Sequence, residues 1–196
     1  MPDDRPYAGI VLAGGGSARL GRDKTRVEVG GRSALDRVLA AFGDAAQIVV
    51  VGNPRPVDRP DVVWTHEEPP GGGPAAGVAA AAAVLSQPWA VVLAGDLPLI
   101  DAAAVHRLLA GARDPHDGAV LVDAGGRRQH LSVAVRTEAL RQRTVGRDWH
   151  GAPMWSLLDG LSLAEVAAHA HETLDLDEPR DIEAARRLAP DSKGPA

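Results

Sequence analysis

A glycine-rich segment near the N-terminus combines residue types that suit phosphate binding. Residues 12–24 read LAGGGSARLGRDK, and three consecutive glycines let backbone N–H groups face an anion without interference from Cβ atoms. Arg19 offers a planar fork for phosphate oxygens, and Lys24 offers a compact positive charge. The chain has two lysines, Lys24 and Lys193, so a lysine placed in this segment indicates a specific charge. The segment therefore predicts a site for a phosphate-bearing ligand.

The same segment departs from two well-known phosphate-binding patterns. The dinucleotide pattern G-x-G-x-x-G begins at Gly14 and Gly16 but meets Arg19 where the third glycine belongs. The P-loop pattern fits Gly16 and Gly21 but requires lysine where the chain has Arg22. We therefore expect neither a dinucleotide fingerprint nor a P-loop.

Three aspartates are candidates to hold a divalent cation against phosphate oxygens. Asp96 follows an apolar run over residues 89–94, and a carboxylate at the end of such a strand suits Mg²⁺ or a simple turn cap. Asp175 and Asp177 are two positions apart, which places both on one side of an extended chain. Asp177 could also cap a helix that begins at Pro179.

Two further loops could contact a nucleobase or a ribose. Asn53 follows the apolar run over residues 47–51, and its amide could read a base edge. Asparagine equally suits a turn before Pro54. The loop over residues 71–77 is rich in glycine and could let a base or ribose approach the backbone closely.

The glycine-rich segment resembles a family signature. Residues 12–24 occupy every fixed position of the pattern L-A-G-G-x-S-x-R-x-G-x-D-K, which is typical of the MobA-like NTP transferases, the molybdopterin-type nucleotidyltransferases. Shorter matches follow in the family's order. Residues 73–77 resemble its G-P-L-A-G loop, residues 95–98 its D-x-P, and residues 175–179 its D-x-D-T-P with Glu178 in place of threonine. The resemblance covers about residues 7–188.

This resemblance implies an enzyme that transfers GMP from GTP to the terminal phosphate of molybdopterin, or its molybdenum form, and releases pyrophosphate. It implies Mg²⁺ as cofactor, with Asp96 and Asp177 as metal ligands. It also implies Lys24, Arg19 and Asp96 as catalytic residues. The residues expected at the nucleotide are Leu12, Ala13, Gly14, Gly15, Gly16, Ser17, Lys24, Asn53, Gly73, Pro74, Gly77 and Asp96. Transient contact with enzymes that deliver or accept the cofactor would suit a labile product.

Other functions remain open at this point. A cytidylyltransferase would use CTP on the same acceptor, and a third possibility is a nucleotidyltransferase with another phosphate acceptor. A closer overall likeness to the guanylyl branch favours GTP. A different class is a non-catalytic nucleotide-binding module that regulates through a partner, but the presence of Lys24 and Asp96 argues against it.

Composition excludes several other classes. The chain has 196 residues and is 45% hydrophobic, as an ordinary globular domain is, and it has no cysteine for disulfides, metal ligation or thiol catalysis. A formal net charge of −5 and an aromatic content of 3% argue against nucleic-acid binding. The apolar runs are too short for a membrane span and the N-terminus lacks signal-peptide features, so we expect no membrane partner and a cytoplasmic location.

The elements that position these residues alternate between strand and helix. Strands are predicted over residues 8–13, 47–51, 62–64, 89–94, 119–122, 131–135 and 172–176. Helices are predicted over residues 33–42, 74–85, 137–143, 154–158, 163–169 and 179–188, with another that begins at Asp101.

This alternation predicts an α/β fold, a single Rossmann-like nucleotidyltransferase domain with a mostly parallel central sheet and helices on both faces. Parallel sheets bind ligands beyond the carboxyl ends of their strands, which is where the segments with Lys24 and Asp96 fall. We expect a flexible N-terminus over residues 1–6, one domain over 7–189 and a flexible tail over 190–196.

Overall fold

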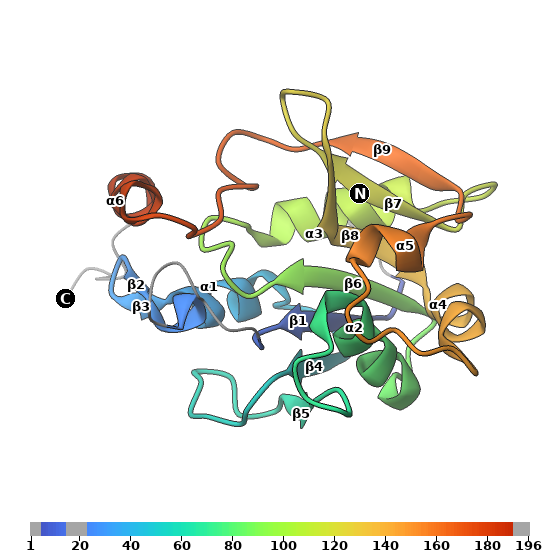
Figure 1. Cartoon of the computed structure of the whole chain (residues 1–196). Helices are drawn as coiled ribbons and strands as arrows, with labels where there is room; N and C mark the ends of the chain where they lie inside the picture. Colours follow the sequence, from blue (N-terminus) through green and yellow to red (C-terminus); the bar gives the residue numbers. More distant parts are fainter. Residues whose placement is uncertain (1–4, 15–22, 190–196) are drawn as a thin grey trace.

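The computed structural model describes residues 5–14 and 23–189, and its centre is a seven-stranded sheet (Figure 1). The strand order is β5-β4-β1-β6-β8-β7-β9. Within this sheet β8 runs antiparallel to both of its neighbours, and the other pairs are parallel. The strands are β1 (Tyr7–Leu12), β4 (Gln47–Val51), β5 (Val63–Thr65), β6 (Trp89–Ala94), β7 (Gly118–Val122), β8 (Arg128–Arg136) and β9 (Leu163–Ala167).

Helices cover both faces of the sheet. The helices are α1 (Ala34–Ala41), α2 (Gly73–Val84), α3 (Ala102–Gly111), α4 (Thr137–Thr144), α5 (Met154–Leu158) and α6 (Pro179–Leu188). Apolar residues of α1 and α3 form one hydrophobic core with one face of the sheet, and those of α2, α4 and α5 form a second core with the other face. These layers confirm the predicted α/β class. Among the described residues, no helix is long and apolar enough to cross a bilayer.

A small separate cluster lies beyond the main sheet. The strands β2 (Glu28–Val29) and β3 (Arg32–Ser33) form an antiparallel pair, and apolar side chains of α6 pack against this region. Figure 1 places this cluster on the side toward which the arrows of β1 and β6 point. The carboxyl ends of β1 and β6 therefore point toward the cluster formed by β2, β3 and α6.

The apolar runs predicted as strands form the centre of the sheet. Helices cover both faces there, so every side chain of these strands must suit a buried position. Ile10 of β1 and Val92 of β6 are fully buried and lie side by side in register. Two helix starts are fixed by side-chain caps, as the sequence predicts. Ser33 Oγ accepts a hydrogen bond from the backbone N–H of Asp36 at 3.0 Å, and Asp101 caps α3 in the same way.

The helix predicted over residues 163–169 is wrong, because this segment contains strand β9. The run has strong helix formers, but its backbone pairs in parallel with β7 from Leu163 to Ala167. Alternate side chains reach opposite cores: Leu163 packs with the α2 side and Val166 with the α3 side. Pairing at the open edge of the sheet therefore overrides the local helix preference.

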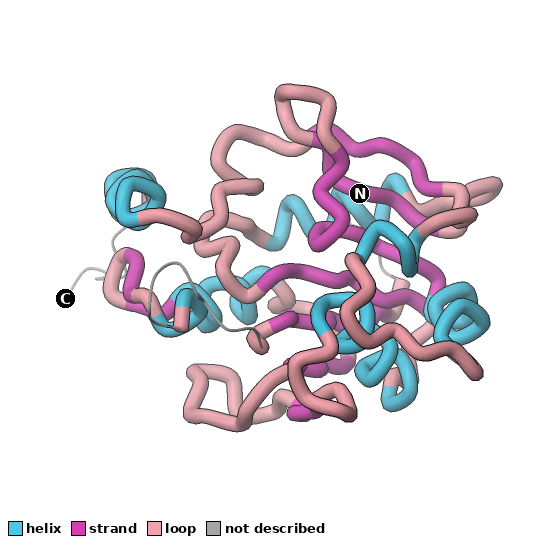
Figure 2. Tube along the Cα trace, viewed as in Figure 1, coloured by secondary structure: helices cyan, strands magenta, loops and turns pink. Residues whose placement is uncertain are grey.

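The strand predicted over residues 172–176 is also wrong. Figure 2 shows loop between β9 and α6. A turn forms there instead, in which His171 has a left-handed φ of 75° and the N–H of Glu172 donates to the carbonyl of His169 at 3.3 Å. The carboxylate of Glu172 also accepts from the N–H of His169 at 2.7 Å, so the side chain competes with any strand pairing of this backbone.

Candidate functional site

Three loops meet at the carboxyl ends of β1, β4 and β6. The N–H of Ala13 donates to Val51 O at 2.8 Å, and the N–H of Gly95 donates to Leu12 O at 2.9 Å. Two glycines permit this close approach. A Cβ at Gly95 would lie 2.9 Å from Leu12 O, and a Cβ at Gly52 would lie 3.0 Å from the backbone of residues 13 and 14. The loops after these strands are therefore held against one another by their backbones.

Lys24 lies at the centre of this edge. It begins a short 3-10 turn, η1 (Lys24–Arg26), whose preceding residue Asp23 accepts a hydrogen bond from the N–H of Thr25 at 3.0 Å. The Lys24 ammonium forms an ion pair with Asp177 and lies 3.9 Å from Asp96 Oδ2. The Lys24 side chain is 18% exposed and that of Asp96 is 22% exposed, so this charge pair is largely shielded from water. The structure thus brings together Lys24, Asp96 and Asp177, the residues for which the sequence predicts catalytic and metal-binding roles.

The carboxylates around Lys24 repel one another. Burial raises the pKa of Asp96, the charge of Lys24 opposes the shift, and the charges of Asp175 and Asp177 add to it. Burial likewise raises the pKa of Asp175, and the charge of Asp177 raises it further. A divalent cation would relieve this repulsion. Asp177 contacts Lys24 directly, whereas Asp175 acts on Asp96 through its charge.

These side chains fit a divalent cation that is shared with a substrate. Among the described residues, no three histidine or acidic side chains converge closely enough to hold a metal unaided. Mg²⁺ is commonly bound by one or two carboxylates together with waters and substrate phosphates. Asp96 and Asp177, with Lys24 between them, match this pattern of an incomplete protein site.

The segment that carries Asp177 is anchored to α3 by a buried ion pair. Arg107 Nη2 donates to both carboxylate oxygens of Glu172, at 2.7 and 2.5 Å. Leu176 is fully buried between Asp175 and Asp177, which fixes the path of the chain at that point. The two aspartates are therefore positioned without the strand that the sequence predicts.

The residues predicted to contact the base lie in the loop after β4 and in the first turns of α2. Asn53 is exposed in the loop after β4, which leaves its amide accessible. Gly73 has a left-handed φ of 86°, and Pro74 follows it in the first turn of α2. Gly77 is buried, and a Cβ there would lie 3.1 Å from Val51 Cγ1. The absence of a side chain at Gly77 therefore lets α2 lie directly on the sheet beside this edge.

The remaining predicted residues divide into two groups. Leu12, Ala13 and Gly14 lie at the end of β1, where Ala13 is buried and Gly14 is exposed. Gly15, Gly16, Ser17 and Arg19 lie outside the described residues, so their predicted contacts with phosphate stay predictions.

The sequence interpretation missed a group that supports Lys24. Arg55, from the loop after β4, donates from Nη1 to Asp23 Oδ2 at 3.1 Å and from Nη2 to Thr25 Oγ1. Burial lowers the pKa of the Arg55 guanidinium and the charge of Asp23 opposes that shift, and arginine remains protonated in proteins. A signal was available for Asp23, which stands inside the family signature. Arg55 gave none, because its partners are distant in sequence.

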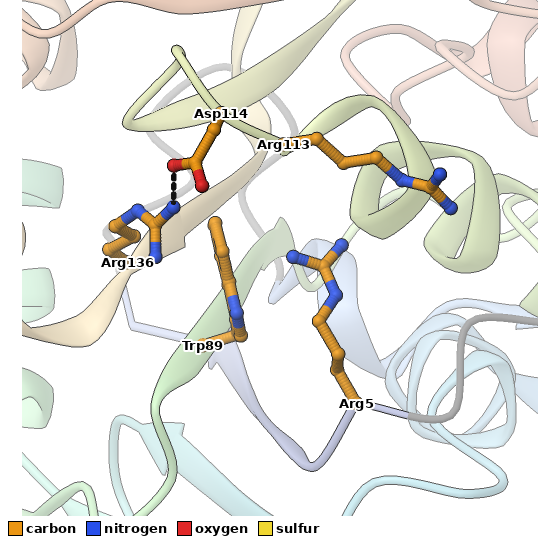
Figure 3. Close-up of a pocket in the computed structure, with 5 residues that line it drawn as sticks. All are labelled: Arg5, Trp89, Arg113, Asp114 and Arg136. Atoms are coloured by element: carbon orange, nitrogen blue, oxygen red, sulfur yellow. Dashed lines mark hydrogen bonds and ion pairs between the residues drawn. The ribbon is translucent and has the colours of Figure 1, made fainter.

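A hollow of about 430 Å³ (Figure 3) lies at the amino ends of β1 and β6. Lys24 lies beyond the carboxyl ends of these strands. The hollow is lined by Arg5, Trp89, Arg113, Asp114 and Arg136. The guanidinium carbons of Arg5 and Arg136 lie 4.4 and 4.6 Å from the centroid of the Trp89 ring. Arg136 also donates to Asp114 at 2.5 Å, and Arg5 to carbonyls at the end of α3. This stack joins α3 to the amino ends of β1 and β6.

Comparison with known proteins identifies the family of this chain. Residues 9–173 match the family described as MobA-like NTP transferase domain. A molybdenum cofactor guanylyltransferase of Mesorhizobium japonicum is 35% identical over 157 residues, which are 74% of this chain and 75% of the relative.

Solved structures share the fold at lower sequence identity. Molybdopterin-guanine dinucleotide biosynthesis protein A from Archaeoglobus fulgidus superposes with a TM-score of 0.71 at 19% identity, over 92% of this chain and 97% of that one. 2-C-methyl-D-erythritol 4-phosphate cytidylyltransferase from Thermus thermophilus has a TM-score of 0.67 at 22% identity, over 91% and 96% of the two chains. The family match and the Mesorhizobium relative go further than the fold: this chain belongs to the MobA-like NTP transferase family of nucleotidyltransferases.

Proposed function

We propose that this chain transfers GMP from GTP to the terminal phosphate of molybdopterin and releases pyrophosphate. Membership of the family makes it a nucleotidyltransferase, and the guanylyltransferase of Mesorhizobium japonicum supports GTP and molybdopterin as the substrates. The observation that carries the proposal is the placement of Lys24 beside Asp96 and Asp177 at the carboxyl edge of the sheet. This arrangement pairs a cation for phosphate oxygens with carboxylates for a metal.

The reaction needs no side-chain nucleophile. A phosphate oxygen of the acceptor attacks the α-phosphorus of GTP, and the bond from that phosphorus to the bridging oxygen breaks. The electron pair leaves with pyrophosphate, whose growing negative charge the Lys24 ammonium neutralises. We expect Arg19 and the backbone amides of residues 14–17 to hold the β- and γ-phosphates.

The magnesium ion of this proposal would be held by Asp96 and Asp177. When bound, it would supply positive charge to the phosphate oxygens of the two substrates. Burial and the neighbouring carboxylates raise the pKa of Asp96, and a bound cation would compensate the negative charge of its ionised form. Lys24 would then be available to a phosphate, because the cation takes over part of the charge of its two carboxylate partners.

The direct test is a pyrophosphate-release assay with Mg²⁺, molybdopterin and one of GTP, CTP, ATP or UTP, with the dinucleotide product identified by mass spectrometry. The proposal requires release with GTP that depends on molybdopterin. Release with CTP alone would identify a cytidylyltransferase, and release that does not depend on molybdopterin would identify another acceptor. GTP binding without any release would identify a non-catalytic module.

A thermal-shift measurement separates binding from turnover. A nucleotide at about 100 times its dissociation constant adds about 2.7 kcal/mol to the stability of the folded state, which is a shift of roughly 5–10 °C for a domain of this size. The proposal requires this shift with Mg²⁺ and GTP.

A cytoplasmic location and transient contact with enzymes that deliver or accept the cofactor are also part of the proposal.

A further inference from the structure

We infer that Arg55 is a positioning residue for the reaction, and that it fixes Lys24 by holding both of its chain neighbours. Arg55 Nη1 donates to Asp23 Oδ2 at 3.1 Å, and Nη2 donates to Thr25 Oγ1. One planar guanidinium thus spans the residues on either side of Lys24. The inference rests on the proposed function, because it assigns Arg55 a role in the same site.

The guanidinium of Arg55 is shielded, unlike that of an ordinary surface ion pair. Its side chain is 10% exposed and lies 5.8 Å from the centroid of the Trp64 ring. Arg26 contacts the same Asp23 oxygen at 3.3 Å from the solvent side, with a side chain that is 67% exposed. Because water screens the exposed Arg26 guanidinium more than the shielded Arg55 guanidinium, Arg55 contributes more to holding the turn.

The turn that contains Lys24 is held on its other sides as well. Thr25 Oγ1 donates to Asp23 Oδ1 at 2.6 Å while it accepts from Arg55, so the three side chains form a closed network. Thr25 Cγ2 also lies 3.2 Å from the position that a Cβ of Gly95 would occupy. Arg55 therefore holds the residues on both sides of Lys24, in a turn that lies near Gly95, and the Lys24 ammonium extends from this turn to Asp96 and Asp177.

The network also connects two functional loops. Arg55 lies two positions after Asn53, the residue predicted to read the base, and its partners lie at the end of the glycine-rich segment. A lysine cannot replace it fully, since an ammonium on a flexible stem lacks the fixed fork that reaches both acceptors. Loss of the clamp should lower kcat for pyrophosphate release by about 10- to 100-fold, because a small displacement of Lys24 weakens its contact with the departing group. The KM for GTP should change less.

The first experiment observes Lys24 without any substrate. The chain has two lysines, so protein labelled with ¹³C-lysine gives two Cε signals, and a Lys24→Arg variant assigns them. In Arg55→Met the Lys24 signal should move toward the position of an exposed lysine. Arg55→Lys contains a third lysine and gives three Cε signals, so an Arg55→Lys/Lys24→Arg variant identifies the Lys24 signal, which should show an intermediate shift. Arg26→Met is the matched control, because it removes the exposed pair with the same Asp23 carboxylate, and it should move the signal much less than Arg55→Met. A wild-type signal in Arg55→Met would overturn the inference.

The second experiment measures kcat and KM for the same variants, with Asp23→Asn added as a variant that removes the other side of the clamp. The double variant Arg55→Met/Asp23→Asn should be no slower than the slower single variant, because both act through one network. Fully additive losses would overturn the inference. If the wild type releases no pyrophosphate, the proposed function fails while the lysine signal still tests the clamp. If the wild type is active and Arg55→Met keeps its kcat, the inference fails and the proposed function stands.

Discussion

Lys24 Nζ lies 3.9 Å from Asp96 Oδ2, although the two residues follow different strands of the sheet. Asp177 contacts the same ammonium from the segment before α6. Asp175 adds its negative charge to the group, so the charge of one lysine is set against the charges of three carboxylates. The excess negative charge favours a further cation at this edge, and the repulsion between the carboxylates can be measured.

Removal of the Lys24 charge should slow the reaction while the fold is retained. Lys24→Met should lower kcat for pyrophosphate release by about 10²–10³-fold, because a preorganised charge on the departing group is lost. Lys193→Met is a matched control, since it removes the other lysine of the chain at a position beyond the family match over residues 9–173. Circular dichroism checks the fold, and equal kcat values for the two variants would contradict the assigned role.

Neutralisation of Asp96 should stabilise the metal-free protein and abolish its activity. Burial and the neighbouring carboxylates raise the pKa of Asp96 above its unfolded value, so its charged form destabilises the folded state at neutral pH. Asp96→Asn should therefore melt at a higher temperature than the wild type at pH 7 in the presence of EDTA.

The gain from Asp96→Asn should depend on pH in a defined direction. The penalty in the wild type is full above the raised pKa of Asp96 and disappears below its ordinary, unfolded value, because the carboxylate is then protonated in both states. The difference in melting temperature should shrink as the pH falls through this window. If Asp96→Asn instead melts below the wild type at pH 7, and this deficit disappears as the pH falls, the charge of Asp96 stabilises the fold and the prediction is wrong.

A side chain at Gly95 should disturb the site through the backbone. The Cβ of Gly95→Ala would lie 2.9 Å from Leu12 O, so strand β1 or the Asp96 loop must move. We expect a loss of about 1–3 kcal/mol in the free energy of unfolding, measured with urea, together with reduced kcat. Gly43→Ala is the control: its Cβ would lie at an ordinary 3.7 Å from Ala40 O, and the change should stay within about 0.5 kcal/mol.

The buried pair between Arg107 and Glu172 should support the segment that carries Asp177. Glu172→Gln leaves the guanidinium facing a neutral amide, and we expect a loss of about 1–3 kcal/mol in urea unfolding and weaker binding of Mg²⁺ with GTP. Glu165→Gln removes an exposed pair with Arg128 at 2.8 Å and should cost less than about 1 kcal/mol. A similar loss of unfolding free energy in both variants would contradict the prediction that Glu172 supports the segment that carries Asp177.

The local sequence predicted correctly those elements whose intrinsic preference for strand or helix agrees with the surroundings that the fold gives them. The residue bounds predicted for β4 and β6 are those observed, because their apolar runs suit strands that are buried on both faces. Ser33 and Asp101 cap their helices as predicted, since a cap depends on residues within one turn. The two wrong predictions, over residues 163–169 and 172–176, concern segments whose structure is set by β7 and by Arg107, which are far away in sequence.

The sequence by itself determined the family, the α/β class and the position of Lys24 and Asp96 after two strands, because these follow from contiguous residues and their spacing. Only the tertiary structure decided that Asp177 rather than Asp175 meets Lys24, and that Arg55 holds the turn from the β4 loop. Such contacts join side chains that the order of strands in the sheet brings together. No local sequence pattern predicts these side-chain contacts, because the energy of each contact depends on burial and on distances that exist only in the folded chain.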